Sequence, residues 1–168
     1  MKILAALATA MIIGSISAGP VLAQGFPNKA VRIIVPFPAG GSFDVTSRLL
    51  AQRMGPALGH NVIVENRPGG GTIVATEYVS RLPADGYTML VVGPSFVINP
   101  ALRSKLPFDP AKDFKAVSQT IALAMAIAVT PTMPVKSLKE LIALAHKRPG
   151  EIAYGTSGPG TSHHLIGE

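Results

Sequence analysis

The sequence predicts an α/β fold built around a parallel sheet. Short runs of β-branched residues alternate with segments of helix length, and most of these runs end in a loop rich in glycine or proline. Strand–helix–strand units with short connections assemble most readily into parallel sheets. With 48% hydrophobic and 14% charged residues, the chain is too apolar for a disordered protein. We therefore expect a packed α/β core.

Residues 1–23 have the pattern of a secretory signal peptide. Lys2 supplies a positive charge, residues 3–13 form an apolar stretch, and small or compact residues lead to a cleavage site after Ala23. A membrane anchor is the alternative, but a spanning helix needs about 20 mainly apolar residues and Pro20 interrupts this one. We predict export to the periplasm, with cleavage after Ala23.

The first strand and the first helix of the mature chain are the clearest elements. Residues 31–35 form a β-branched run that two nearby prolines end, which is typical of a buried strand. A helix is predicted over residues 42–58, with Ser42 as its N-cap, Asp44 in its first turn and Gly59 at its end. We interpret its apolar residues as one helical face: Phe43, Val45, Leu49, Leu50 and Met54.

The remaining elements follow in the same alternation. A strand at 62–64, a helix at 72–82, a strand at 87–92 and a short helix at 96–103 precede a Pro-rich stretch at 106–110. Strand-like stretches at 115–119 and 123–129, a helix at 137–147, a strand at 152–154 and the start of a helix after Gly160 complete the chain. Ser137 and Glu140 have the spacing of a capping box. Because the chain stops in the first turns of its last helix, we expect a fragment or a truncated reading frame.

Two segments share one design, namely a strand, a Gly- and Pro-rich loop with hydroxyl residues, and a helix N-terminus. They are residues 35–42 and residues 154–162. The first N–H groups of a helix lack intrahelical acceptors and its dipole is positive there, so a carboxylate or phosphate can bind without Arg or Lys. Both loops are expected at the carboxyl ends of parallel strands, where ligands of α/β proteins bind. A tight turn capped by serine is the alternative for each. Gly69 to Gly71 is interpreted as a flexible turn, with lining of the cleft as its alternative.

Other chemistries find little support in the sequence. The net charge is +6, but the basic residues are scattered and no aromatic pattern accompanies them, so nucleic acid is not an expected partner. The chain has no Cys, and the adjacent His163 and His164 would point to different faces of a helix, so we expect neither a metal nor a cofactor. An exported hydrolase using Ser157 or Ser162 with one of these histidines stays open as an alternative, although no acid partner is visible.

Several segments, in this order and spacing, resemble the Bug family, the substrate-binding receptors of tripartite tricarboxylate transporters. They are residues 31–44, 64–69, 83–88, 99–100, 106–114 and 154–165. The resemblance implies a type II periplasmic-binding-protein clamshell. Residues 24–120 would be the first part of lobe 1, and residues 121–168 the crossover and the start of lobe 2. Because family members continue for roughly as long again, lobe 1 is expected to be incomplete and lobe 2 only begun.

The resemblance also implies a function and a set of ligand-binding residues. We expect a monomeric receptor, not an enzyme, that captures a dicarboxylate, tricarboxylate, acidic amino acid or aromatic acid for the permease subunits of a transporter. The matching loop positions are Phe37, Ala39, Gly40, Gly41 and Ser42, and Thr156, Ser157, Gly158 and Thr161. Asp44 and His164 also match motif positions, and Ser95 follows the third strand, where it is expected to line the cleft. A truncated remnant that binds nothing is the remaining alternative.

Overall fold

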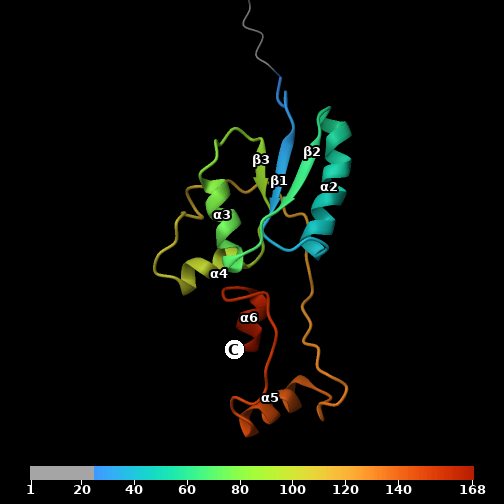
Figure 1. Cartoon of the computed structure of the whole chain (residues 1–168), viewed down its shortest axis with the longest axis vertical. Coiled ribbons are helices and arrows are strands. Elements are labelled where there is room, and N and C mark those ends of the chain that lie inside the picture. Colours follow the sequence, from blue (N-terminus) through green and yellow to red (C-terminus); the bar gives the residue numbers. More distant parts are fainter. Residues whose placement is uncertain (1–24) are drawn as a thin grey trace, which may run out of the picture.

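A computed structural model describes residues 25–168; the predicted signal peptide lies outside them. Three strands form one parallel sheet in the order β2-β1-β3 (Figure 1). They are β1 (Val31–Val35), β2 (Val62–Asn66) and β3 (Thr88–Leu90). The predicted parallel α/β architecture is therefore confirmed.

The central strand β1 forms the core of the sheet. Val31, Ile33, Ile34 and Val35 are between 0% and 3% exposed. A parallel sheet has helices on its faces, so its central strand is buried on both sides and is hydrophobic almost throughout. Burying each such side chain contributes about 1.5–3 kcal/mol. The β-branched run identified in the sequence is therefore the strand around which the rest of the sheet assembles.

Two helices lie on opposite sides of the sheet (Figure 1). α2 (Ser42–Leu58) connects β1 to β2, and α3 (Ile73–Ser80), preceded by the short η1 (Gly70–Thr72), connects β2 to β3. The chain moves outward from β1 to β2 and then returns past β1 to β3, so two right-handed crossovers place the helices on different faces. The direction of winding changes between β1 and β3. Ligands of open α/β sheets bind beside such a point, at the carboxyl ends of the strands.

The predicted apolar face of α2 is wrong for two of its members. Val45 is 49% and Leu49 is 59% exposed, whereas Ser47 is 1% exposed. At about 100° per residue, Phe43, Leu50 and Ser47 share one face, and Val45 and Leu49 lie between about 200° and 240° from Phe43. The end of the helix is as expected, since Gly59 has the left-handed conformation of a C-cap.

The predicted N-cap of α2 is also wrong. Gly41 occupies the N-cap position with extended dihedral angles, and Ser42 is the first helical residue. No side chain caps the helix from that position. The carboxylate of Asp44, in the first turn, instead accepts the N–H of Gly40, the residue before the N-cap, at 2.8 Å.

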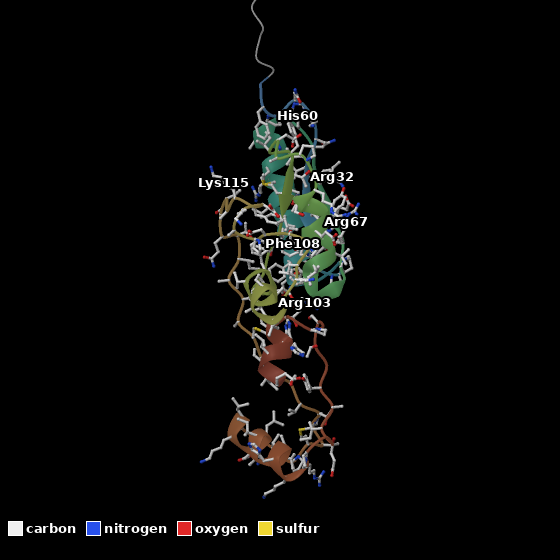
Figure 2. All side chains as sticks on the ribbon, turned by 90° about the vertical axis from the view of Figure 1, so that its left-hand side faces the viewer. Arg32, His60, Arg67, Arg103, Phe108 and Lys115 are labelled. Carbon is white, nitrogen blue, oxygen red and sulfur yellow. The ribbon has the colours of Figure 1, made fainter. Side chains whose placement is uncertain are left out.

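The Pro-rich stretch that follows α4 (Ser95–Leu102) packs against the body of the sheet. Phe108 is 8% exposed and lies within this body in Figure 2. Its ring meets that of Phe114 edge-on at 6.1 Å, and Phe114 meets Phe96 of α4 in the same way at 5.3 Å. This segment therefore packs with α4 and the sheet, although it has no regular secondary structure.

The last part of the chain holds two helices, α5 (Leu138–Lys147) and α6 (Ser162–Gly167). The capping box of α5 is confirmed, since Ser137 Oγ accepts the N–H of Glu140 at 3.2 Å. The strands predicted at 115–119, 123–129 and 152–154 are wrong: these segments have no regular structure. A strand needs a neighbour that completes its hydrogen bonds, and none of the three described strands lies beside them in the sheet.

Within the described residues, none of the helices has the length and apolar character that a membrane span requires.

Candidate functional site

The loop between β1 and α2 presents an open glycine-bearing surface. Ala39, Gly40, Gly41 and Ser42 are all exposed. Gly40 has a φ of +83° and nothing lies within 4 Å of where its Cβ would be. The N–H of Ser42 has no hydrogen-bond acceptor in the described part of the chain, because it stands in the first turn of α2. A ligand could therefore approach the start of this helix along the backbone.

The buried side chain of Asp44 holds this loop in place through hydrogen bonds. It is 2% exposed, and its carboxylate accepts the N–H of Gly40 at 2.8 Å, the Nδ2 of Asn66 at 2.9 Å and the Nε of Arg48 at 3.1 Å. These hydrogen bonds, that of Arg48 first, lower the pKa of Asp44 to about 2 although burial opposes the shift. The charge of Asp44 thus stabilises the start of α2. The N–H of Gly40, expected to be a donor to the ligand, is used within the loop instead.

Asn66 is a further part of the site that the sequence analysis did not identify. Its Nδ2 donates to the carbonyl of Phe37 at 3.1 Å as well as to Asp44, and its Oδ1 accepts from Arg48 at 3.0 Å. Asn66 therefore ties the end of β2 to the loop that follows β1. Its position directly after a strand-like run was the available signal, because such residues gather at the carboxyl edge of a parallel sheet.

The loops after β1 and β3 meet at this edge. The rings of Phe37 and Phe43 stack at 4.3 Å with an interplanar angle of 12°. Gly93 lies against both, since a Cβ there would be 3.1 Å from Phe43 and 3.4 Å from Phe37. Ser95, the first residue of α4, is 3% exposed. The structure thus brings the first predicted loop and the region of Ser95 together at the point where the winding changes direction.

The second predicted loop, residues 155–161, is held by its own hydroxyl groups. Thr156 Oγ1 accepts the N–H of Gly158 at 3.1 Å. Thr161, 3% exposed, donates to the carbonyl of Gly158 at 2.7 Å and caps α6 by accepting the N–H of His164 at 3.3 Å. Ser157 stays exposed. These contacts define the shape of the loop and leave Ser157 as its accessible hydroxyl.

The histidines of α6 do not form a recognisable catalytic or metal site with the described residues. Ser157 Oγ is 3.4 Å from His163 Nδ1, but no carboxylate of residues 25–168 is paired with His163. His164 Nδ1 is buried without a partner, and its Nε2 is 3.7 Å from Glu168. No group of three or more potential ligands that could hold a metal ion occurs in the described part of the chain.

The two loops lie at the same end of the sheet, with α6 below α4 in Figure 1. The second loop abuts the turn of residues 69–71 and Asn99 of α4, since Cβ atoms at Gly71 and Gly160 would clash with Pro159 and Asn99 respectively. The turn of residues 69–71 is therefore a contact surface for the second loop.

Two surface depressions lie away from both loops. One, of about 790 Å³, lies between α2 and β2 and is lined by residues that include Arg48, Gln52 and His60. The other, of about 250 Å³, lies near Lys29 and Tyr87. The assignment of the loop residues to a ligand therefore stays a prediction that rests on backbone chemistry.

Two arginines that could attract an anion lie together on one side of the sheet, Arg32 and Arg67 (Figure 2). Both are paired with Glu65, and hydrogen bonds from Arg32 and then Arg67 lower the pKa of that carboxyl. Arg67 also covers the ring of Tyr78, with 3.7 Å from its guanidinium carbon to the ring centroid. The charges of Arg32 and Arg67 are therefore paired with a carboxylate of the same chain.

Comparison with known proteins gives a consistent result. Residues 46–168 match the family described as "Tripartite tricarboxylate transporter family receptor". The protein BugT of Bordetella pertussis is 35% identical over 153 residues, which are 90% of this chain and 47% of BugT. The chain spans about half the length of the curated relatives it matches.

Similar solved structures agree with this family match. A structure described as a periplasmic transporter is 38% identical with a TM-score of 0.73, covering 85% of this chain and 48% of that one. A protein of R. palustris solved with adipate is 34% identical with a TM-score of 0.69, covering 82% and 46% of the two chains. The predicted fold class, about half of a periplasmic-binding-protein-like α/β fold, is confirmed.

Proposed function

The chain belongs to the receptor family of tripartite tricarboxylate transporters, whose members are periplasmic binding proteins, and on that premise we propose that it captures a small carboxylate for uptake. The proposal includes export with cleavage after Ala23, binding without catalysis, action as a monomer, and delivery of the ligand to the permease subunits of a transporter.

The observation that carries the proposal is the exposed start of α2. This helix has 17 residues, so its dipole contributes roughly half a positive charge at its N-terminus. The N–H of Ser42 is free, and Gly40 and Gly41 leave the approach open. A carboxylate is the simplest ligand for such a group of donors. The binding of adipate by the similar R. palustris protein supports the same chemical class.

The second loop would hold the ligand from the other side. Its helix α6 has only six residues, so we assign the interaction to the exposed hydroxyl and backbone of Ser157 rather than to a helix dipole. Thr161 and Thr156 would maintain the loop shape through the hydrogen bonds described above. The excess of 15 Lys and Arg over 9 Asp and Glu in the full sequence, of which cleavage after Ala23 would remove only Lys2, would favour the approach of an anion.

A thermal-shift screen tests the ligand class. Adipate, succinate, citrate, glutamate and benzoate are compared with glucose as the neutral control. A ligand that binds only the folded state stabilises it by about 2.7 kcal/mol at a concentration one hundred times its Kd. We expect a shift with at least one carboxylate and none with glucose. A response to neutral sugars alone, or ester hydrolysis abolished by Ser157→Ala, would reject the proposal.

Two variants at one position test the donor directly. Ser42 is the first residue of α2 and follows Gly41, whose φ of −74° and ψ of 166° suit the residue before a proline. Ser42→Pro therefore removes the N–H while proline is well tolerated at this helix position. A hydrogen bond to a charged group is worth about 1.5–3 kcal/mol, so affinity should fall about tenfold or more. Ser42→Ala removes only the hydroxyl and should bind more tightly than Ser42→Pro. Equal affinity of the two variants would show that the N–H is not a donor.

A further inference from the structure

The contact between the first lobe and the second loop is formed by a buried asparagine and by glycines. Asn99 of α4 is 1% exposed, and its Nδ2 donates to the carbonyl of Gly71 at 2.8 Å. Its Oδ1 is buried without a hydrogen-bond partner and faces Gly160. One side chain thus bridges a turn of the first lobe and the loop that opens α6.

Both backbones at this contact approach too closely for a side chain. A Cβ at Gly160 would clash with Asn99 Oδ1, and a Cβ at Gly71 would clash with the carbonyl of Pro159. The two glycines therefore permit the loop to sit directly on the turn. Any larger residue at either position would hold the two parts of the chain further apart.

The turn itself is strained. Gly70, Gly71 and Thr72 have consecutive positive φ values of 57°, 63° and 81°, and Thr72 is 6% exposed. A left-handed conformation costs a residue with a side chain roughly 1–2 kcal/mol. Such a conformation persists only where the surrounding structure holds it, and it is concentrated at functional sites. The hydrogen bond from Asn99 to Gly71 is one of the contacts that hold this turn.

We propose that Asn99 is a positioning residue that, with Gly71 and Gly160, sets the distance between the two loops that would grip the ligand. Phe43, next to the first loop, packs on Gly93, two residues before α4, and Asn99 within α4 packs on Gly160. The segment from Gly93 to Asn99 thereby connects the two loops. The inference rests on the proposed carboxylate-binding function, because the spacing matters only if both loops contact one ligand.

Two glycines of the same turn provide a matched test. Gly71→Ala and Gly70→Ala introduce the same methyl group at similar positive φ values, but at Gly70 the nearest contacts are ordinary ones to Val74 and Ile73, at 3.5 and 3.7 Å. Both variants carry comparable backbone strain, and only Gly71→Ala obstructs the second loop. The difference in effect between Gly71→Ala and Gly70→Ala therefore measures the contribution of the contact between Gly71 and the second loop.

The first measurement is the distance between the lobes without ligand. The chain has no cysteine, so Arg53→Cys and Ile166→Cys introduce the only two sites for spin labels in the full chain. We expect Gly71→Ala and Asn99→Ala to lengthen or broaden the distance distribution, and Gly70→Ala to leave it unchanged. In the second loop, Gly160→Ala should act like Gly71→Ala, because it adds both backbone strain and a clash. Gly158→Ala, at a φ of +104°, adds strain without a clash and should have a smaller effect.

The second measurement is the affinity for adipate. If Gly71→Ala reduces the docked population to about a tenth, the apparent affinity falls about tenfold. Equal effects of Gly70→Ala and Gly71→Ala on the spin-label distances would overturn the positioning role. Loss of adipate binding in every variant and in the parent chain would instead reject the proposed ligand, while the distances would still decide the role of Asn99.

Discussion

Residues 31–108 and residues 121–168 show a similar alternation of apolar runs and loops in sequence, but they differ in how far their side chains are buried. All the buried hydrophobic residues of the described chain lie in the first region, whereas in the second only Gly160 and Thr161 are buried. The second region nevertheless contains a strongly apolar segment at 121–129, with Leu123, Met125, Ile127 and Val129 between 41% and 50% exposed. The difference shows that an apolar run becomes a strand only where a neighbouring strand accepts its hydrogen bonds and a helix covers its face.

The largest expected effect is at Ile34 in the first region, and Ile127 in the second region is its control. Ile34 of β1 is 0% exposed and Ile127 is 50% exposed. Ile34→Ala should lower the free energy of unfolding by about 2–5 kcal/mol, because it removes buried surface and leaves a cavity. Ile127→Ala should change it by no more than about 0.5 kcal/mol. Urea unfolding measures both values. A loss at Ile127 as large as that at Ile34 would mean that the second region packs on a core of its own.

Acid should destabilise the first region by protonating Asp44. Its pKa is about 2 in the folded protein against an ordinary value of 3.8, so its ionised form stabilises the fold. This contribution is fully present above pH 4 and is lost as the pH falls towards 2. Asp44→Asn should lower the melting temperature at neutral pH, and the difference from the parent chain should shrink over this range.

The comparison of variant with parent is needed because Glu65, Asp85 and Asp109 also have lowered pKa values. Asp85 is the useful control. It is exposed, pairs with Lys29 at 3.2 Å and accepts the N–H of Tyr87. Asp85→Asn should shift the acid transition less than Asp44→Asn does. The reverse order would contradict the assignment of Asp44 as the carboxylate that stabilises the start of α2.

The sequence predicted those features that depend on neighbouring residues. The strand at 31–35, the C-cap at Gly59 and the capping box of Ser137 and Glu140 each follow from a local pattern, and the structure confirms all three. The edge of the sheet at which the first loop lies was also predictable, because the order of strands and helices determines it.

Features that depend on distant residues were not predicted. Asn66 and Asn99 hydrogen-bond to the backbone of loops 29 and 28 residues away, and no periodicity reports such pairs. The face of α2 was misassigned because hydrophobicity alone placed Val45 inward, whereas the buried residues include Asp44 and Ser47. A buried polar residue is determined by its partner, and the partner is visible only in the fold.

A smaller and local effect is expected at the cap of α5 in the second region. Ser137 accepts the N–H of Glu140 at 3.2 Å, and the Glu140 carboxylate accepts the N–H of Lys136 at 2.6 Å. Ser137→Ala should destabilise this helix by about 1 kcal/mol, so the amides of α5 should exchange with solvent roughly five times faster. Ser137→Asp retains an acceptor oxygen and should restore the slower rate. The amides of β1 should be unaffected, because the two regions share little buried surface. If the amides of β1 also exchanged about five times faster, the two regions would unfold as one cooperative unit. The high exposure of the second region would then say nothing about that region's stability.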